Sequence, residues 1–236
     1  DCRIVGVIVE QRSESRRVGW GEAAPLLGFS AESLDQALDA LGRVADQIEG
    51  TTLLDAGLTE MWEAVSKEGR SASVQFALDS ALLALWAEGH NETVHGALGA
   101  DHSHLDLNGL IPNDVTEVEA AAQRLQAAGY RAVKLKVARR SVAEDIERVR
   151  ALHDGVGRDV TIRLDANRGW SLGEAMTFAE GIADIPIAFV EEPLQERDQL
   201  SDFAAQTDLS VALDETTREA SSDLLDALSF VEAVVL

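Results

Sequence analysis

The first hundred residues carry a pattern of apolar and polar positions that predicts two strands followed by helices. Residues 3–12 and 17–24 are rich in Val, Ile and alternating apolar positions, and a polar turn separates them, which favours a pair of strands. A helix is expected from Ser30, because apolar residues recur there at helical spacing. These apolar residues are Leu34, Leu38, Leu41 and Val44. Residues 71–89 predict a second helix, whose wide apolar ring indicates burial between layers.

From His104 onward the pattern changes to short apolar runs that alternate with amphipathic stretches. The apolar runs predict six strands, at residues 105–111, 132–137, 160–165, 187–190, 210–213 and 233–236. Strands that alternate with helices at this spacing indicate a parallel sheet with right-handed crossovers. The periodicity alone is compatible with both an open doubly wound sheet and a (β/α) barrel.

The helices of this second half have recognisable starts and stops. Three sequences fit the capping box, in which a side chain at each end of the first turn satisfies the other's backbone N–H. They are Thr116-x-x-Glu119, Ser141-x-x-Glu144 and Ser171-x-x-Glu174. Gly129 and Gly155 stand where helices are expected to stop.

The change of pattern along the chain predicts two domains, an α+β domain at residues 1–98 and a (β/α) domain at residues 99–236.

The charge of the chain narrows the classes of partner. With 42 acidic and 20 basic side chains, the formal net charge is −22. Such a chain repels nucleic acid and anionic membranes, so we expect neither as a partner. No apolar run is long enough to cross a bilayer, no segment has the pattern of a signal peptide, and Cys2 is the only cysteine. These absences favour a cytoplasmic location, and they leave the oligomeric state open.

Charged and amide side chains follow the apolar strands at their carboxyl ends. The motifs, in chain order, are Lys134-Leu-Lys136, Asp165-Ala-Asn167, Glu191-Glu192-Pro193 and Asp214-Glu215. In a parallel barrel these strand ends meet at one rim, where active sites lie. Any one of the acids could be an ordinary solvated strand end or helix cap. The ordered set on four successive strands makes coincidence improbable and predicts a functional rim.

Acids from three consecutive strands suit a hard divalent cation, and Mg²⁺ is expected, with Mn²⁺ as a possible substitute. The cation would bind a substrate carboxylate and neutralise charge that develops when an adjacent carbon loses its proton. Lys134 and Lys136 are two residues apart and therefore point to the same side of their strand. A lysine close to a metal, a second lysine and apolar walls is expected to have a lowered pKa, which would make it a usable base.

This set of motifs resembles the enolase superfamily, and specifically its muconate-lactonizing subgroup. The resemblance covers nearly the whole chain and implies a TIM-type (β/α) barrel with an N-terminal α+β capping domain. It implies that Asp165, Glu191 and Asp214 are the metal ligands. It further implies that Lys136 is the base, with Lys134 as its supporting neighbour. The flanking residues Asn167, Glu192 and Glu215 would then support the ligands.

Within the subgroup, the sequence is most similar to the ortho-succinylbenzoate synthases. The similarity includes the loop Gly21-Glu-Ala-Ala-Pro-Leu-Leu-Gly-Phe-Ser30 and the strand Leu107-Asn-Gly-Leu-Ile-Pro112. It implies substrate-binding roles for Phe29, Ser30, Asn108 and Gly109. The implied reaction is a carbon–oxygen lyase step of menaquinone synthesis. It is the Mg²⁺-dependent dehydration of 2-succinyl-6-hydroxy-2,4-cyclohexadiene-1-carboxylate to ortho-succinylbenzoate through an enolate.

Two other functions stay open on the sequence alone. An N-acylamino-acid racemase or dipeptide epimerase on the same scaffold would begin with the same proton abstraction. An inactive barrel fragment that acts as a binding protein is the third possibility. The family's barrel has further strands after the sixth and a second active-site lysine, whereas this sequence ends at Val234-Val-Leu236. We therefore expect a barrel that is incomplete at its C-terminus, and favour a longer natural protein.

Overall fold

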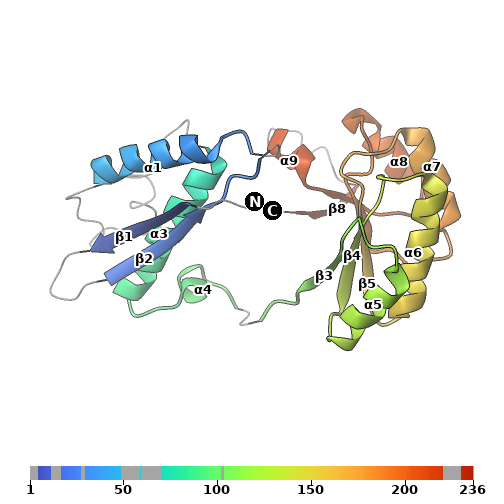
Figure 1. The fold of residues 1–236 in the computed structure, drawn as a ribbon, viewed down its shortest axis with the longest axis horizontal. Coiled ribbons are helices and arrows are strands. Elements are labelled where there is room, and N and C mark those ends of the chain that lie inside the picture. The colour runs from blue at the N-terminus through green and yellow to red at the C-terminus, as the bar shows by residue number, and fades with distance from the viewer. Residues whose placement is uncertain are drawn as a thin grey trace. The chain divides into compact units, whose positions relative to one another are not determined.

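The computed structural model describes residues 5–11, 17–27, 30–48, 59, 71–101, 104–219 and 230–235. The chain divides into two compact units, Asp1–His104 and Leu105–Leu236. The border expected from the sequence was after residue 98. Figure 1 colours the chain from the N-terminal unit in blue to the C-terminal unit in green, yellow and red.

The N-terminal unit combines a pair of strands with helices, as its sequence pattern predicts. Its elements are β1 (Val5–Gln11), β2 (Arg17–Ala23), α1 (Leu34–Ile48), α3 (Ala72–Gly89) and α4 (Val94–Ala97). The two strands are antiparallel. Gly19 and Gly21 let β2 approach α3 closely, because a Cβ atom at either position would collide with the backbone carbonyl of Ala81 or Ala77. The core between α1 and α3 includes Leu41, Leu78 and Leu82.

The start of α1 differs from the sequence prediction. The helix begins at Leu34 rather than at Ser30. Ser33 and Gln36 form the reciprocal pair there: the Gln36 N–H donates to Ser33 Oγ at 3.3 Å and the Ser33 N–H donates to Gln36 Oε1 at 2.8 Å. Ser30 instead stabilises the preceding loop, where its hydroxyl accepts the Leu26 N–H at 2.9 Å. A hydroxyl three residues upstream of the true cap therefore cannot reach the first turn.

The C-terminal unit is a parallel sheet with helical crossovers. The strands are β3 (Asn108–Ile111), β4 (Ala132–Lys136), β5 (Thr161–Asp165), β6 (Phe189–Glu191), β7 (Val211–Leu213) and β8 (Val231–Val234). Each strand pairs in parallel with the next strand along the chain, in the order β3-β4-β5-β6-β7-β8. Among the described residues the sheet does not close on itself. The six predicted strands are thus present, although β3 begins three residues later and β8 two residues earlier than expected.

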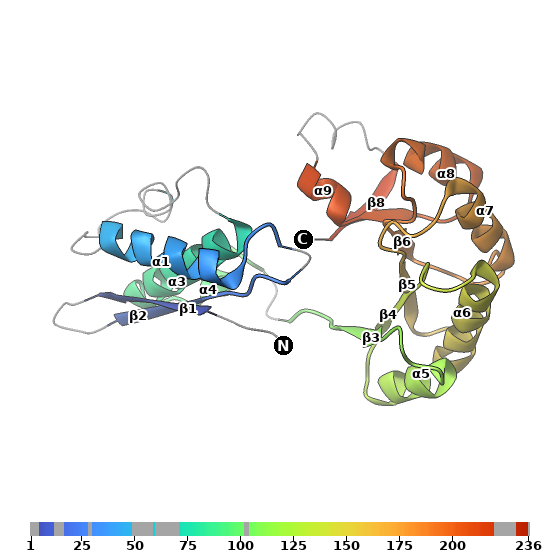
Figure 2. The ribbon, with the colours of Figure 1, turned by 45° about the horizontal axis from the view of Figure 1, so that its top comes forward.

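Helices cover one face of this sheet. They are α5 (Val118–Ala127), α6 (Val142–Val156), α7 (Leu172–Gly181) and α8 (Leu200–Gln206), the last preceded by a 3₁₀ turn at Arg197–Gln199. A short helix, α9 (Glu215–Glu219), follows β7. Figure 2 shows α5 to α8 in an arc along the sheet. Leu135, Leu152, Ile162 and Phe178 are fully buried between the helices and the strands.

Two of the three predicted capping boxes are present and one is absent. Ser141 with Glu144 and Ser171 with Glu174 form both reciprocal hydrogen bonds. The Thr116 box does not form, because α5 begins at Val118 with Glu117 as the capping position and no side-chain cap. Glu119 accepts instead from Gln123 Nε2, at 3.1 Å on the helix surface.

Of the two glycines predicted to end helices, one does so and the other does not. Gly129 follows Ala128, the C-terminal capping residue of α5, and has φ +91°, as expected of a helix stop. Gly155 is wrong as a stop: it lies inside α6, and Gly157, with φ +66°, ends that helix. Gly155 is needed for close packing, since a Cβ there would lie 2.7 Å from both the Ala122 Cβ and the Glu119 carbonyl oxygen of α5.

Within the described residues, no helix is long and apolar enough to cross a membrane.

Candidate active site

Parallel register brings lysine and carboxylate side chains to one level of the sheet. Lys136 is in register with Asp165, and Asp165 is in register with Glu191. Glu191 is in register with Ala212 of β7, so Asp214 follows two residues beyond this level. All of these residues come from carboxyl ends of strands, the edge where barrel active sites lie. The structure therefore gathers the strand-end motifs on one rim.

Both lysines contact the carboxylates. Lys134 Nζ donates to Glu191 Oε2 at 2.8 Å and lies 3.3 Å from Asp165 Oδ2. Lys136 Nζ donates to Asn167 Oδ1 at 2.9 Å and lies 3.6 Å from Asp165 Oδ2. The Asp165 and Glu191 side chains are almost fully buried, so these charges are compensated inside the protein rather than by water.

The pKa values of the site follow from burial and from this crowding. Burial lowers the pKa of Lys134, but the hydrogen bond to Glu191 and the charges of Asp165 and Glu191 outweigh it, and the net shift is upward. The carboxylates thus stabilise the Lys134 ammonium. Burial raises the pKa of Glu191; Lys134 opposes the shift, while the charges of Asp165 and Asp214 add to it.

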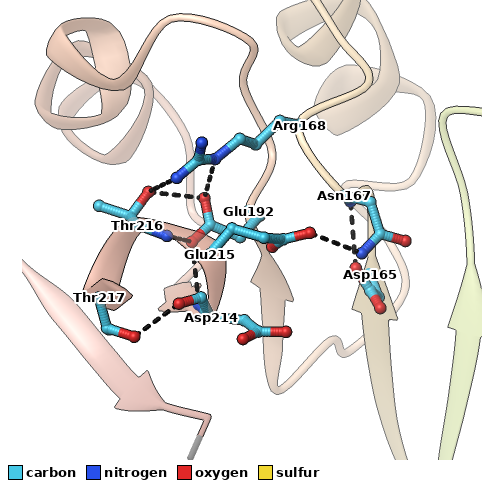
Figure 3. Close-up of polar contacts among 8 residues, drawn as sticks. All are labelled: Asp165, Asn167, Arg168, Glu192, Asp214, Glu215, Thr216 and Thr217. Carbon is cyan, nitrogen blue, oxygen red and sulfur yellow. Dashed lines mark hydrogen bonds and ion pairs between the residues drawn. The ribbon is translucent and has the colours of Figure 1, made fainter. Parts of the chain in front are cut away.

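Asn167 links Lys136 to the next part of the rim, and Figure 3 shows its contacts with Asp165 and Glu215. Its N–H donates to Asp165 Oδ1 at 3.1 Å, and its Nδ2 donates to Glu215 Oε1 at 3.1 Å. The second oxygen of that carboxylate, Glu215 Oε2, is buried and accepts no hydrogen bond from the described residues. Asn167 therefore holds a half-buried carboxylate whose buried oxygen has unused capacity to bind a donor or a cation.

Glu192 occupies the centre of a second cluster, also drawn in Figure 3. Its carboxylate accepts from the N–H groups of Asp214 and Thr216, at 2.9 and 2.6 Å, and from Thr216 Oγ1 at 2.8 Å. Arg168 Nε donates to the same carboxylate at 3.2 Å, and Arg168 Nη2 donates to Thr216 Oγ1 at 3.1 Å. Glu192 is thus a structural hub for the loops that follow β5, β6 and β7.

Helix α6 holds the loop after β4 in place through a hydrogen bond. Ala138 has φ +59°, and its N–H donates at 2.8 Å to the buried carboxylate of Asp145 in α6. Gly169 packs against this turn, because a Cβ there would lie 2.5 Å from the Ala138 Cβ and 2.7 Å from its carbonyl oxygen. The loops that follow Lys136 and Asn167 therefore touch each other through their backbones.

Asn108 and Gly109, two of the four residues predicted to bind substrate, lie away from the carboxylate rim. Asn108 starts β3 in register with Ala132, at the end of the sheet opposite the carboxylate rim. Gly109 faces α5, since a Cβ there would lie 3.1 Å from Leu125. Ser30 belongs to the N-terminal unit, and Phe29 lies outside the described residues. Asn108 and Gly109 therefore do not lie with the lysines and acids, and the roles of all four residues remain predictions.

The donor set at the rim fits a hard divalent cation. Asp165, Glu191 and Asp214 are close enough that the charges of the two aspartates raise the pKa of Glu191. Two features of the structure differ from a formed metal site: Lys134 is bound to Asp165 and Glu191, and among the described residues no three acidic, His or Cys side chains form a metal-binding group. The unused oxygen of Glu215 and the crowded carboxylates are nevertheless the surroundings that a cation would stabilise.

Arg168, Thr216 and Asp145 are functional neighbours of the site to which the sequence alone gave no role. For Asp145 a signal existed: it lies three residues after Val142 and four before Val149, which places an acid on the apolar face of α6. Thr216 gives no comparable signal, because threonine is common at the start of a helix. Only the packing of two loops reveals its contact with Glu192.

Comparisons with known proteins assign family models to both parts of the chain. Residues 3–85 match the model described as MenC, N-terminal domain, and residues 117–229 match the model described as Enolase C-terminal domain-like. The o-succinylbenzoate synthase of Yersinia pseudotuberculosis serotype O:1b (strain IP 31758) is 34% identical over 221 residues, which cover 92% of this chain and 60% of the relative. The L-Ala-D/L-Glu epimerase of Bacillus subtilis (strain 168) is 30% identical over 220 residues, covering 89% of this chain and 59% of the relative.

The crystal structure of the dipeptide epimerase from Enterococcus faecalis V583, complexed with Mg and the dipeptide L-Leu-L-Tyr, is 25% identical. It superposes with a TM-score of 0.79 over 89% of this chain and 60% of that protein, and this likeness confirms the predicted fold class. The chain thus spans 59% to 60% of the length of these three proteins. Matched by the two domain models and by these relatives, the chain belongs to the enolase superfamily.

Proposed function

We propose that the protein is an enzyme that removes a proton from a carbon next to a carboxylate, with Lys136 as the base. The observation that carries this proposal is the rim itself. Two lysines on one strand face contact buried carboxylates from the next two strands. One lysine would suffice for a structural ion pair, so the second amine is available to transfer a proton to or from a substrate.

The two lysines are suited to different tasks. The Lys134 ammonium is bound to both Glu191 and Asp165, and its side chain is 20% exposed. The Lys136 side chain is 36% exposed and is oriented by the carbonyl oxygen of the Asn167 side chain. We assign proton transfer to Lys136 because it is the more accessible amine and is held in a defined direction. Lys134 then supplies a fixed positive charge beside it.

Mg²⁺ is the cofactor that we propose, with Mn²⁺ as a substitute, and Asp165, Glu191 and Asp214 as the residues that would hold it. A bound divalent cation would supply Lewis-acid stabilisation to the carboxylate of the substrate. Burial and the charges of Asp165 and Asp214 raise the pKa of Glu191, so a cation would add to the compensation that Lys134 provides. Asn167 and Glu192 would keep the acid-bearing loops in place through the hydrogen bonds described above.

For the substrate, we propose 2-succinyl-6-hydroxy-2,4-cyclohexadiene-1-carboxylate, which loses water to give ortho-succinylbenzoate. Support comes from the MenC N-terminal domain match at residues 3–85 and from the 34% identical o-succinylbenzoate synthase. In this carbon–oxygen lyase reaction, Lys136 would take the proton next to the ring carboxylate. The resulting ammonium could return that proton to the departing hydroxyl group, so that one residue would serve both steps.

An epimerase or racemase is the second candidate function. The 30% identical L-Ala-D/L-Glu epimerase and the Mg-bound dipeptide epimerase structure favour it. Both candidates start with removal of a proton next to a carboxyl group. They differ in the second step, because epimerisation returns a proton to the opposite face of the carbon and dehydration expels hydroxide from the neighbouring position.

Activity of the full-length protein tests the choice between the two. The cyclohexadiene substrate would be mixed with protein and Mg²⁺ while its ultraviolet absorbance is followed, and N-succinylamino acids and dipeptides would be incubated in D₂O and examined by NMR. Lys136→Met removes the proposed base, and Arg150→Met is the matched control. Arg150 forms an exposed ion pair with Asp184, away from the rim.

Loss of absorbance that disappears in Lys136→Met and on chelation, but persists in Arg150→Met, would support the lyase. Deuterium incorporation into an amino-acid derivative without dehydration would support the proposed base and cation and contradict the proposed substrate class. If neither reaction occurs with full-length protein, the proposed function is wrong. If Lys136→Met retains activity, Lys136 is not the base.

A further inference from the structure

The cluster around Glu192 contains a buried charge that does not itself contact the lysines. Glu192 is 1% exposed, and four hydrogen bonds from three residues satisfy its carboxylate. Among these three residues, only Arg168 brings a positively charged side chain. A buried carboxylate that loses its cationic partner is strongly destabilised, so Arg168 and Glu192 should act as one unit.

Three loops meet in this cluster. Arg168 stands in the loop after β5, Glu192 directly follows Glu191 of β6, and Thr216 lies at the start of α9 after β7. Each of these loops begins with one of the acids proposed to hold the cation: Asp165, Glu191 and Asp214. The cluster therefore connects the backbones that carry the three acids, without using the acids' own side chains.

The backbone of these loops is held in an unfavourable conformation. Asn167, Arg168 and Glu192 have φ values of +42°, +57° and +43°, in the left-handed region that residues other than glycine rarely adopt. Cross-loop bonds hold them there: the Arg168 N–H donates to the Glu192 carbonyl at 2.8 Å, and the Glu192 N–H donates to the Ala212 carbonyl at 3.0 Å. Strain of this kind persists when surrounding contacts impose it, and it is concentrated at functional sites.

We propose that Arg168, Glu192 and Thr216 form a positioning device that sets the spacing of Asp165, Glu191 and Asp214 for a divalent cation. The most direct link is the Asp214 N–H, which Glu192 Oε1 holds at 2.9 Å while the same oxygen holds the Thr216 N–H. Arg168 is thus a positioning residue that acts through Glu192. This inference rests on the proposed function, because it requires that the rim binds a cation.

The test measures binding of Mn²⁺ to full-length protein in the absence of substrate, from the electron paramagnetic resonance signal of the free ion. Arg168→Met removes the guanidinium, Glu192→Gln removes the buried charge, and the double variant removes both. We expect each single variant to bind Mn²⁺ about tenfold to 100-fold more weakly than the unchanged protein. The double variant should bind Mn²⁺ at least as tightly as the single variant with the lower affinity, because the double variant leaves no buried charge without a partner.

Matched controls separate positioning from general damage. Arg150→Met removes an arginine–carboxylate pair that is exposed and distant from the rim, and Gly155→Ala disturbs helix packing without touching these loops. Both should bind Mn²⁺ as the unchanged protein does. If Arg168→Met does not fold, Thr216→Val, which removes only a hydroxyl group, decides the question, with Thr177→Val in α7 as its control.

The outcomes are distinct. Unchanged Mn²⁺ affinity in folded Arg168→Met, or in Thr216→Val where that variant decides, would overturn the positioning role and leave the proposed function standing. Losses in the two single variants that simply add in the double variant would show that Arg168 and Glu192 do not act together. Absence of Mn²⁺ binding by the unchanged protein would instead overturn the proposed function, and the inference with it.

Discussion

At the scale of single residues, Gly155 sets the distance between α5 and α6. The sequence suggested a helix stop, whereas the structure uses the missing side chain for close packing against Ala122 and the Glu119 carbonyl. Gly173 is the contrasting case, because it lies in the first turn of α7 and a Cβ there would meet nothing within 4 Å. Substitution of Gly155 therefore measures the effect of glycine on packing, and substitution of Gly173 measures its intrinsic cost in a helix.

We therefore expect Gly155→Ala to lower the free energy of unfolding by about 1–3 kcal/mol, because the added methyl group must push against a backbone carbonyl. Gly173→Ala should raise it by about 0.5–1 kcal/mol, because alanine loses less chain entropy in a helix. Urea titrations of the two variants and the unchanged protein measure both values. A stabilised Gly155→Ala variant would contradict the packing role.

Asp145 gives a prediction for pH dependence. Burial raises its pKa, and the Ala138 N–H with the charges of Arg148 and Arg140 offsets part of that shift. An acid with a raised pKa in the folded state contributes stability below its unfolded pKa, near 3.8, and this contribution is lost as the pH rises through the folded-state pKa. Asp145→Asn retains a carbonyl oxygen for the Ala138 N–H and removes the titration.

The stability of Asp145→Asn relative to the unchanged protein should therefore increase as the pH rises from about 4 to about 7. Urea unfolding at several pH values would measure this difference. Asp184→Asn is the control, because its exposed carboxylate has a pKa lowered by Arg150 and should give a weak dependence of opposite sign. A constant difference for Asp145→Asn would show that Asp145 ionises in the folded protein as it does in the unfolded chain.

The sequence could predict those parts of the site that depend on strand alternation. Lys134 and Lys136 share a face because they are two residues apart, and strand ends identify Asp165, Glu191 and Asp214. The contacts of Glu192 could not be predicted, because they depend on the conformations of two other loops. The direction of the Lys134 pKa shift could not be predicted either, since its sign depends on which carboxylates lie within hydrogen-bonding distance.

At the scale of elements, helix starts show what a capping pattern can and cannot predict. The same Ser/Thr-x-x-Glu pattern occurs before α5, α6 and α7, but the reciprocal bonds form only at α6 and α7. The pattern is local, whereas the first residue of a helix also depends on how the preceding loop leaves the sheet. Strand ends vary for the same reason, and β3 begins at Asn108 although the apolar run starts earlier.

The cap variants Ser141→Ala and Ser171→Ala should each lower the free energy of unfolding by about 1 kcal/mol, because the N–H of the third helical residue loses its acceptor. Thr116→Ala is the matched control and should change it by less than about 0.5 kcal/mol, since no cap bond is lost. Thermal or urea unfolding distinguishes these outcomes. Equal losses in all three variants would mean that Thr116 caps α5 in solution.

At the scale of the whole molecule, the net charge of −22 opposes compaction. Arginine and lysine are too few to pair with most of the acids, so exposed carboxylates repel one another. Mobile cations screen this repulsion, and the distance over which charges act falls as salt is added. Stability should therefore depend on ionic strength more than it does for a protein of balanced charge.

We expect the midpoint of thermal unfolding to rise by several degrees between about 0.02 and about 0.3 M KCl and then to level off, because the screening length shortens most in that range. Scanning fluorimetry across a KCl series would measure this. Sucrose at matched osmolality serves as the control for general exclusion of solutes. A midpoint that is constant over this range would show that the carboxylates are spread too widely to interact.

The neighbour order of the sheet, in which every strand pairs with the strand next along the chain, also has a consequence for folding kinetics. Each pairing closes only the loop of one crossover, so the entropic barrier to each step is small. The acids of the rim, Asp165, Glu191 and Asp214, are brought together by two such local steps, and no distant part of the described chain has to arrive first. The polar rim can thus assemble progressively as the chain emerges during synthesis, one crossover at a time.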